Sequence, residues 1–311
     1  MTIIDSNTPS PQLAPDSVIA TIGMFDGVHR GHATLLTHLV TEAACLRLKS
    51  AVVTFRQHPQ LVFNPNSDLR MILPLNERLR LIASFGVDYV ILLDFTPQLA
   101  ALTSSQFMSM LRDNFGISHL IVGFNHHFGH NREDSFPQYV AQGRELGVTV
   151  LKAPEYLGRY APVSSSIIRK LISSGRVEDA ALCMGRPFSI SGIVVHGFKN
   201  GRKIGFPTAN VGEFYPLLIL PHNGVYAGHA TVSGISHNAM INIGCRPTLH
   251  NGKQITVEAN LFDFDDDIYG QPITVTFTRF MRYEVMFSGL DELKRQLAHD
   301  RDESIKILTG K

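Results

Sequence analysis

The chain has 311 residues, of which 44% are hydrophobic and 18% are charged, and its formal net charge at pH 7 is +1. This length is sufficient for two hydrophobic cores of ordinary size, so two domains are expected. A nearly neutral chain has no overall electrostatic field to attract nucleic acid. A nucleic-acid partner is therefore not expected, and any anionic ligand requires a local site.

The cysteines and the N-terminal residues indicate the compartment. Cys45, Cys183 and Cys245 are far apart and lack the paired spacing of a zinc site or a disulfide framework. Residues 1–17 lack the basic start and the apolar stretch of a secretion signal, and no run approaches the ~18 apolar residues of a membrane span. We therefore expect a cytoplasmic protein without a membrane partner.

The first half of the chain alternates between short apolar runs and amphipathic segments. The runs rich in β-branched residues predict strands at 17–22, 50–55, 88–95, 119–124 and 148–152. The segments between them predict helices at 32–48, 76–86, 104–116 and 138–147. In the first helix, Leu36, Leu39 and Ala43 fall on one face. Strands alternating with helices predict right-handed βαβ units, hence a Rossmann-like domain with a doubly wound parallel sheet.

The pattern changes after two further helices predicted within 164–185. Glycine, proline and asparagine turns then separate apolar–polar alternations, which predict strands at 188–196, 224–232, 239–244, 254–264 and 272–280. A final amphipathic helix is expected at 290–308. These patterns are typical of an antiparallel β-barrel with one covering helix. We place the boundary near residue 184, which gives domains 1–183 and 184–311.

An acidic run at residues 263–267 has the composition of a calcium-binding loop but not its pattern. It lacks the glycine at the sixth position and the glutamate at the twelfth that such a loop requires. We therefore expect a solvated hairpin tip at this position.

The sequence GMFDGVHRGH, which begins at Gly23, lies at the corner between the first strand and the first helix. In a doubly wound sheet this corner meets a helix N-terminus, which favours an anion. Gly23, Gly27 and Gly31 allow the backbone to approach a phosphate. His29 and His32 supply hydrogen-bond donors for a transferring phosphoryl group, so the pattern favours a nucleotide triphosphate. On spacing alone, two other interpretations stay open: zinc ligands that lack a third partner nearby, and surface histidines.

A serine-rich turn at residues 164–166 leads into a helix whose first turns carry Arg169 and Lys170. The N–H groups of a helix N-terminus and a guanidinium together form a reasonable phosphate clamp. The residue types are equally compatible with a plain helix N-cap.

The segment HGFKNGRKIGFPTAN, which ends at Asn210, combines glycines with the basic pair Arg202 and Lys203. It matches neither a Walker A loop nor the glycine-rich loop of protein kinases. Thr208 and Asn210 are two oxygen ligands that face one side of an extended segment, so they are suited to hold Mg²⁺ beside ATP. An ordinary hairpin turn is the alternative.

Glu258 is a single carboxylate on an otherwise apolar predicted strand. Neighbouring side chains can position such a group to accept a proton during phosphoryl transfer. From the pattern alone, a solvent-facing glutamate is the simpler interpretation.

These segments together resemble one family. GMFDGVHRGH is similar to the Gly-x-Phe-Asp-Gly-x-His-x-Gly-His signature of nucleotidylyltransferases. Three further segments resemble the FAD synthetase half of bacterial bifunctional riboflavin kinase/FAD synthetases and follow in the same order along the chain. They are VVTFRQHPQLVF, VGFNHHFGHNRE and VSSSIIRKLISSGRVEDA. Five segments of the second half resemble the riboflavin kinase module of the same family: GRKIGFPTAN, NGVYAG, INIGCRPT, VEANLFDF and MRYEVMFSGLDELKRQL. The resemblance covers nearly the whole chain.

The resemblance implies an ATP site for adenylyl transfer in the first domain, with His29 and His32 as catalytic residues. The residues implied to bind this ATP are Gly23, Phe25, Asp26, Gly27, His29, His32, Ser164, Ser165 and Arg169. Asn125 and Phe128 are implied to bind flavin. The positions that depart from the family pattern are Met24, Gln57, Ser166 and His126, and the loop 125–134 also lacks the final glycine of the pattern.

In the second domain, the resemblance makes Glu258 the catalytic base that accepts the proton of the ribityl hydroxyl. The residues implied to bind the second ATP are Gly201, Arg202, Lys203, Gly205 and Thr208. Thr208 and Asn210 are implied to hold Mg²⁺. The residues implied to lie on the flavin side are Arg282, Glu284 and Phe287.

The implied function is therefore twofold: riboflavin is phosphorylated to FMN with Mg-ATP, and FMN is adenylylated with ATP to give FAD and pyrophosphate. One alternative is an adenylyltransferase for a pantetheine or nicotinate nucleotide, which would resemble only the first corner. Another is a protein that binds flavin without turnover, against which the intact His32, Thr208 and Glu258 argue. The partners expected are small-molecule substrates, and the oligomeric state does not follow from the sequence.

Overall fold

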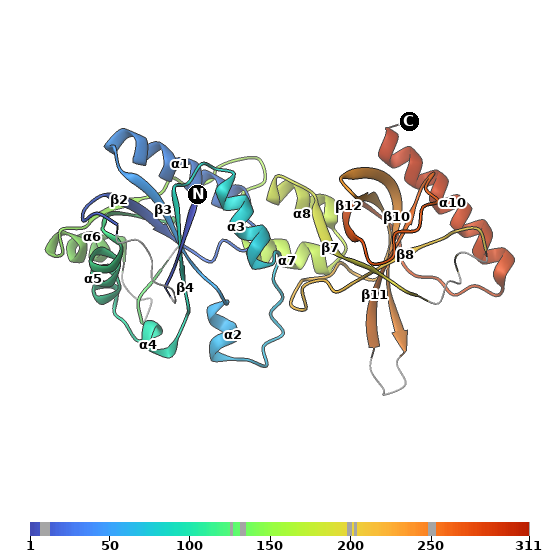
Figure 1. The fold of residues 1–311 in the computed structure, drawn as a ribbon, viewed down its shortest axis with the longest axis horizontal. Coiled ribbons are helices and arrows are strands. Elements are labelled where there is room, and N and C mark those ends of the chain that lie inside the picture. Colours follow the sequence, from blue (N-terminus) through green and yellow to red (C-terminus); the bar gives the residue numbers. More distant parts are fainter. Residues whose placement is uncertain are drawn as a thin grey trace. The chain divides into compact units, whose positions relative to one another are not determined.

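The computed structural model describes residues 1–6, 13–124, 127–130, 135–197, 201, 204–247 and 253–310. The chain divides into two compact units, Met1–Ser165 and Ser166–Lys311. One unit is built around a parallel sheet and the other around a barrel (Figure 1). The helices between residue 166 and the predicted boundary near residue 184 belong to the second unit. How much of the chain each activity needs stays a prediction.

A six-stranded sheet forms the centre of the first unit, in the order β1-β4-β3-β2-β5-β6. Every neighbouring pair is parallel. Its strands are β1 (Thr2–Asp5), β2 (Val18–Ile22), β3 (Lys49–Phe55), β4 (Tyr89–Leu93), β5 (Ile117–Val122) and β6 (Thr149–Lys152). The predicted strands correspond to β2 through β6. β1 is not predicted from the sequence, because its four residues are too few to show a period.

Helices cover both faces of this sheet, as the doubly wound prediction requires. The helices described between residues 30 and 145 are α1 (Arg30–Leu46), α2 (Pro59–Phe63), α3 (Leu75–Ala83), α4 (Pro97–Ala100), α5 (Ser104–Phe115) and α6 (Phe136–Glu145). The short α2 and α4 bury no side chain. One core contains Leu36 from α1 and Ile82 from α3. A separate core contains Leu111 from α5 and Tyr139 from α6. The two cores lie on opposite faces because alternate side chains of a strand point to opposite sides.

In the second unit, six antiparallel strands close a barrel in the order β10-β11-β8-β7-β12-β9. They are β7 (Phe188–Val195), β8 (Ala209–Gly212), β9 (Gly224–Val232), β10 (Ile235–Pro247), β11 (Lys253–Leu261) and β12 (Pro272–Arg282). The short β8 was predicted only as an extended segment. The barrel prediction is otherwise confirmed.

Three aromatic side chains, from β7, β9 and β12, pack together in the core of the barrel. The Tyr226 ring lies edge-on to Phe277 at 5.2 Å, and Phe188 lies 5.9 Å from Phe277. All three side chains are buried. Such aromatic pairs supply much of the apolar area that a small barrel needs for its core.

The helices described beside the barrel strands are α7 (Ser165–Ser173), α8 (Val177–Met184) and α10 (Leu290–Thr309). The covering helix expected at 290–308 is α10, which packs against β9, β10 and β12 (Figure 1). α8 packs against β7 and β12.

The acidic run at residues 263–267 lies in the connection between β11 and β12. Asp263, Asp265, Asp266 and Asp267 are exposed, as expected. The expected hairpin is wrong, because β11 and β12 are not neighbours in the barrel. Local composition indicates a turn but does not say which strands it joins.

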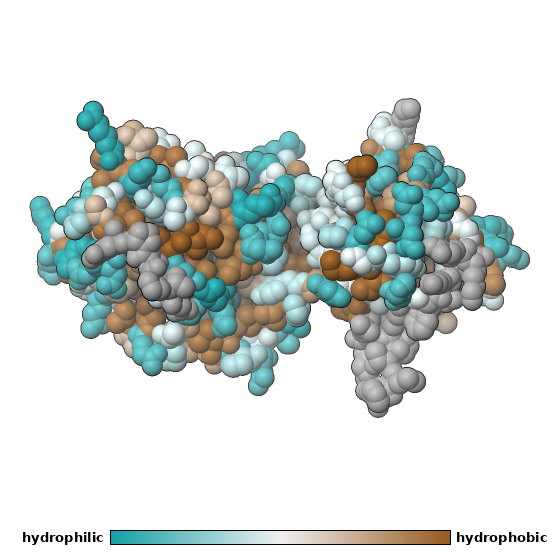
Figure 2. Space-filling model, in the orientation of Figure 1, coloured by the Kyte–Doolittle hydropathy of each residue, from teal (hydrophilic) through white to brown (hydrophobic). Residues whose placement is uncertain are grey.

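On the face drawn in Figure 2, hydrophilic residues alternate with hydrophobic patches on both units. Among the described residues, no helix has the length and apolar character needed to cross a membrane.

Candidate active sites

The corner after β2 fixes two imidazole rings at the start of α1. His29 is the N-cap residue of α1, and its Nδ1 accepts a hydrogen bond from the backbone N–H of His32 at 3.3 Å. The two rings are stacked, with centroids 3.7 Å apart and planes 15° apart. Side-chain capping satisfies one of the free N–H groups of the helix and orders this turn. Two potential donors therefore stand side by side where the helix favours an anion.

Glycine is favoured at two positions of this corner for different steric reasons. Gly27 has a φ of +83°, and a Cβ there would lie 2.9 Å from Cδ1 of Ile72. A Cβ at Gly31 would lie 3.2 Å from the His29 ring. Phe25 and Val28 also have positive φ, which is unfavourable for residues with a side chain. The corner is thus a constrained backbone in which glycine leaves room for the His29 ring.

The Asp26 side chain has a role in the fold of this corner. It is 1% exposed, and its carboxylate accepts hydrogen bonds from the backbone N–H groups of Ile72 at 3.0 Å and Leu73 at 3.2 Å. Its backbone carbonyl accepts a bond from Oγ of Ser165 at 2.7 Å. The structure therefore brings the serine-rich turn against the histidine corner. The carboxylate and carbonyl of Asp26 hold the loop in shape from both sides.

Arg78 on α3 supports the same corner and was missed from the sequence. Its side chain is 1% exposed and donates to the carbonyl of Met24 at 3.0 Å and to that of Phe55 at 2.6 Å. These bonds join the corner loop to the end of β3. A cation in an amphipathic helix pattern is normally an exposed residue, so the sequence held no signal for this role.

Ser164 and Arg169 flank the start of α7. Ser164 immediately precedes the first residue of the helix, and Arg169 lies about one turn into it. Arg169 belongs to the second unit. Its approach to the phosphates beside His29 stays a prediction.

A cavity of about 760 Å³ opens at the carboxyl ends of β2 and β3. Its wall contains the ends of these strands, at Ile22 and Phe55, and the rings of Phe63 and Phe95. Phe128 also lines it and stacks on Tyr139, with centroids 4.3 Å apart. A cavity of this size with aromatic walls suits a planar ring system such as a flavin. Asn125, the other predicted flavin ligand of this unit, lies outside the described residues.

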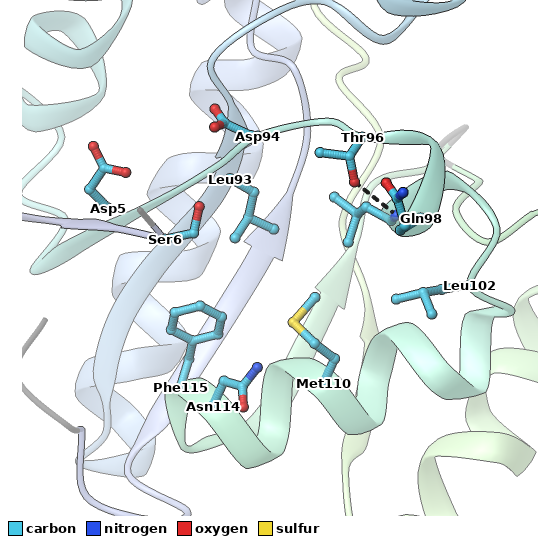
Figure 3. Close-up of a pocket in the computed structure, with 11 residues that line it drawn as sticks. Asp5, Ser6, Leu93, Asp94, Thr96, Gln98, Leu102, Met110, Asn114 and Phe115 are labelled. Atoms are coloured by element: carbon cyan, nitrogen blue, oxygen red, sulfur yellow. Dashed lines mark hydrogen bonds between the residues drawn. The ribbon is translucent and has the colours of Figure 1, made fainter. Parts of the chain in front are cut away.

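A separate hollow of about 520 Å³ lies beside β1, β4 and α5 (Figure 3). Asp5, Asp94 and Thr96 lie at its polar end, and Met110 and Phe115 line its apolar wall. Arg56 joins the two carboxylates, at 2.7 Å from Asp5 and 3.0 Å from Asp94. None of the predicted site residues lines this hollow.

The second unit has a cavity of about 280 Å³ in which the predicted kinase residues meet. The predicted residues in its wall are Gly201, Thr208, Glu258, Arg282, Glu284 and Phe287. They come from sequence positions far apart, so the barrel topology assembles them. Arg202 and Lys203, the predicted basic pair, lie outside the described residues.

Glu258 and Thr208 form the polar centre of this cavity. Oγ1 of Thr208 donates to Oε2 of Glu258 at 3.2 Å. Asn210 is the cross-strand partner of Glu258 in the β8–β11 ladder. A Cβ at Gly197 would lie 2.4 Å from the Asn210 amide, so glycine leaves room for this side chain. A hydroxyl, an amide and a carboxylate thus lie close together, and their oxygens are the donors that Mg²⁺ prefers.

The two glycines predicted to bind ATP differ in their constraints. A Cβ at Gly201 would lie 2.3 Å from the carbonyl oxygen of Phe206, so only glycine fits there. Gly205 has a φ of +87° with open space around it, so it serves the turn conformation.

The flavin-side residues Arg282, Glu284 and Phe287 lie at the end of β12 and beyond. The Arg282 guanidinium lies 6.0 Å from the centroid of the Phe287 ring. Glu284 accepts a bond from Asn223 at 3.4 Å, and a Cβ at Gly244 would lie 2.8 Å from its Oε1.

Three polar residues at or beside this cavity were missed from the sequence. Asn242 lies directly opposite Glu258 on β10 and lines the cavity. Asn260 also lines it and donates to the carbonyl of Pro207 at 2.6 Å. Both are polar residues on apolar strands, at positions that share a side with Glu258, so this pattern could have found them. Asp300 on α10 binds Arg282 and carries no comparable signal.

A second, small hollow of about 60 Å³ adjoins the cavity. Thr208 and Pro207 line it together with Phe264 and Tyr269 from the connection after β11. Thr208 therefore lies between the two hollows. In the part of the chain that the structure describes, no group of three His, Cys, Asp or Glu side chains is placed to hold a metal ion.

The first unit is a parallel α/β unit with paired histidines at a helix N-terminus, and the second is a closed barrel with a carboxylate beside a threonine. Together they define a two-domain phosphate-transferring enzyme. The model of the FAD synthetase family matches residues 12–167, and that of the riboflavin kinase family matches residues 184–308. The chain belongs to the bifunctional riboflavin kinase/FMN adenylyltransferase family.

Individual relatives agree with this assignment. The chain is 34% identical to the bifunctional riboflavin kinase/FMN adenylyltransferase of Bacillus subtilis, over 94% of this chain and 93% of that one. It is 37% identical to the enzyme of the same name from Escherichia coli K12, over 93% and 92% of the two chains. A crystal structure titled macrolide-efflux protein from Streptococcus pneumoniae shares the fold, with a TM-score of 0.87 and 29% identity over 98% of this chain and 99% of that one.

Proposed function

We propose that the two sites described above carry the two reactions of this family. The chain is a bifunctional enzyme: it phosphorylates riboflavin to FMN with ATP and adenylylates FMN with ATP to give FAD and pyrophosphate. The observation that carries the assignment of residues is the cavity that unites Thr208, Glu258 and Arg282 in the barrel. The assignment of each residue to a step is our proposal.

In the kinase step, the ribityl hydroxyl attacks the γ-phosphorus of ATP, its proton passes to a base, and ADP leaves. Glu258 is the base, because its carboxylate lies in the cavity and is oriented by the 3.2 Å bond from Thr208. Riboflavin occupies the larger cavity, against Arg282 and Phe287. The nucleotide enters from the small hollow, so Thr208 stands between donor and acceptor. This arrangement keeps the reacting groups close together.

Mg²⁺ belongs to the same proposal. Thr208 and Asn210 would hold it, and their oxygen ligands fit that ion. When bound, Mg²⁺ offsets negative charge on the phosphates of ATP. Gly201 and Gly205 shape the loop beside these ligands, and Arg202 and Lys203 are proposed to bind the phosphates.

In the adenylyl step, a phosphate oxygen of FMN attacks the α-phosphorus of ATP, and the bond to pyrophosphate breaks. His29 and His32 stabilise the charge that develops on the phosphates, because their rings are fixed at the N-terminus of α1. Ser164, Ser165 and Arg169 are proposed to bind the same phosphates. FMN would place its ring in the aromatic cavity lined by Phe128. Asn125 is proposed as a further flavin ligand.

The test is a product analysis of the purified protein with riboflavin, ATP and Mg²⁺. We expect FMN first and then FAD, separated by chromatography. FMN as the sole product would show that the first site is inactive in this chain. Absence of both products would overturn the proposal, and binding of flavin without turnover would support the non-enzymatic alternative.

A further inference from the structure

Asp300 is a buried carboxylate on the covering helix α10, outside every sequence motif of the kinase site. It is 1% exposed. Its oxygens accept bonds from Nε of Arg282 at 3.0 Å and from Nη2 of Arg282 at 2.6 Å. Nε2 of Gln296, one turn earlier on the same helix, donates to it at 2.8 Å. A carboxylate that is so fully buried and bonded has one orientation, so it can fix the orientation of its partner.

Arg282 is held by this carboxylate and lines the kinase cavity. The side-on pair of bonds from Nε and Nη2 fixes the plane of the guanidinium, because two parallel bonds leave it no rotation. Nη1 also donates to the carbonyl of Tyr283 at 3.0 Å. The guanidinium lies 6.0 Å from the Phe287 ring, within the range of a cation–π contact.

The same face of α10 forms part of the cavity wall. Leu293 and Leu297 line the cavity, and Asp300 follows Leu297 by three residues, so the three side chains lie along one side of the helix. α10 therefore contributes two apolar contacts and one anchoring carboxylate to the site. Since Arg282 lines the same cavity, a shift of its guanidinium would change the shape of the cavity.

We propose that Asp300 is a positioning residue of the riboflavin kinase site, which orients Arg282 so that its guanidinium and the Phe287 ring form one wall of the flavin pocket. The inference rests on the proposed function of this cavity. It makes α10 a part of the substrate site, in addition to its role in covering the barrel. Asp300 acts through Arg282 and contacts no substrate itself.

The first test compares the Asp300→Asn variant with an Asp302→Asn variant. Asp302 lies on the same helix, and its side chain is exposed. We expect Asp300→Asn to raise the KM and the Kd for riboflavin by roughly tenfold, since a charge-assisted pair is lost. The kcat should change by less than about threefold, because Glu258 and Thr208 are untouched. Asp302→Asn should behave as the unsubstituted enzyme. An unchanged KM in a folded Asp300→Asn variant would overturn the inference.

The second test is a double-mutant cycle on the Kd for riboflavin, measured by quenching of flavin fluorescence. If Asp300 acts only through Arg282, Arg282→Met raises the Kd, and adding Asp300→Asn raises it no further. Independent effects that multiply in the double variant would show that Asp300 supports the barrel in general, and would overturn the inference.

A third variant keeps the test decisive if Asp300→Asn does not fold. Arg282→Met combined with Asp300→Leu removes both charges together, and such apolar replacement of a buried pair is usually tolerated. We expect its riboflavin Kd to equal that of Arg282→Met alone, and a further tenfold loss would overturn the inference. The unsubstituted enzyme is assayed beside every variant. Absence of FMN formation there would contradict the proposed function, whereas losses confined to the variants concern Asp300.

Discussion

At the scale of single residues, the two active sites depend on groups that can be changed without changing the fold around them. His32 is the clearest case in the first unit. His32→Ala should slow FAD formation from FMN by roughly 10² to 10⁴, the range for loss of one preorganised donor or proton-transfer group. FMN formation from riboflavin should hardly change. His38→Ala on the same helix is the matched control, and equal loss of both activities in His32→Ala would contradict two separate sites.

Glu258 gives the corresponding prediction for the second unit. Glu258→Gln keeps the side-chain volume but removes the proton acceptor, so riboflavin phosphorylation should fall by roughly 10² or more while KM changes little. Conversion of added FMN to FAD should continue at the normal rate. Each variant is assayed from riboflavin and from FMN, beside a thermal melt. Near-normal FMN production by a folded variant would remove Glu258 from the mechanism.

At the scale of elements, the loop between β2 and α1 combines an unusual backbone with close packing. Gly27→Ala should lower Tm and slow FAD formation, because alanine is unfavourable at this positive φ and its Cβ would contact Ile72 at 2.9 Å. Gly86→Ala is the control, since Gly86 has a φ of +80° with open space around it. It should lower the free energy of unfolding by about 1 kcal/mol, and Tm with it, and leave the FAD rate unchanged. Equal effects on the FAD rate would show that packing against Ile72 is unimportant.

The start of β3 is joined to β4 by Asp88. Its carboxylate accepts bonds from Nζ of Lys49 at 2.9 Å and from the backbone N–H and Oγ of Ser50 at 3.0 and 2.8 Å. Burial raises the pKa of Asp88, but the bonds from Lys49 and Ser50 outweigh it, so the pKa lies below the ordinary value of 3.8. A carboxyl group whose pKa is lower in the folded state than in the unfolded state stabilises the fold when the pH is above its unfolded pKa. This stabilisation is lost as the pH falls through the folded pKa.

The resulting prediction concerns Asp88→Asn. Its Tm should be below that of the unsubstituted protein at pH 7, and the difference should shrink as the pH falls below about 4. Thermal melts of both proteins at a series of pH values measure this. A difference in Tm that stays constant down to pH 2 would mean that the charge of Asp88 does not contribute.

At the scale of the whole molecule, the two units have separate cores, so the kinase half should work alone. Residues 184–311 contain the barrel and α10 and should phosphorylate riboflavin. The piece 166–311 should have the higher Tm, because α8 packs on β7 and β12 and Glu178 pairs with Arg279 at 3.2 Å. Both pieces are assayed for FMN formation and melted side by side. A folded but inactive 184–311 piece would place part of the kinase site before residue 184.

The sequence by itself determined the order of elements and the most local site. Apolar runs rich in β-branched residues predicted five strands of the parallel sheet, and apolar–polar alternation predicted five of the six barrel strands, because both patterns are local properties of the chain. GMFDGVHRGH indicated the phosphate corner for the same reason, since a strand, a tight turn and a helix N-terminus follow one another within it. Thr208 and Glu258 were predicted as candidate residues, but not as a bonded pair.

Only the tertiary structure decided which distant groups meet. Three features join segments whose local sequences do not indicate that they meet. They are the pairing of β1 with β4, the choice of neighbouring strands for β11 and β12, and the contact between Ser165 and Asp26. Arg78 and Asp300 are charged residues in helices, which the pattern places on the surface, yet both are buried because they bond groups brought to them by the fold. Burial of a charge is stable only with such partners. The carbonyls bonded to Arg78 and the Arg282 side chain bonded to Asp300 lie in other segments of the chain, so a pattern within one helix does not reveal them. The burial of Arg78 and Asp300 was therefore decided by the tertiary structure alone.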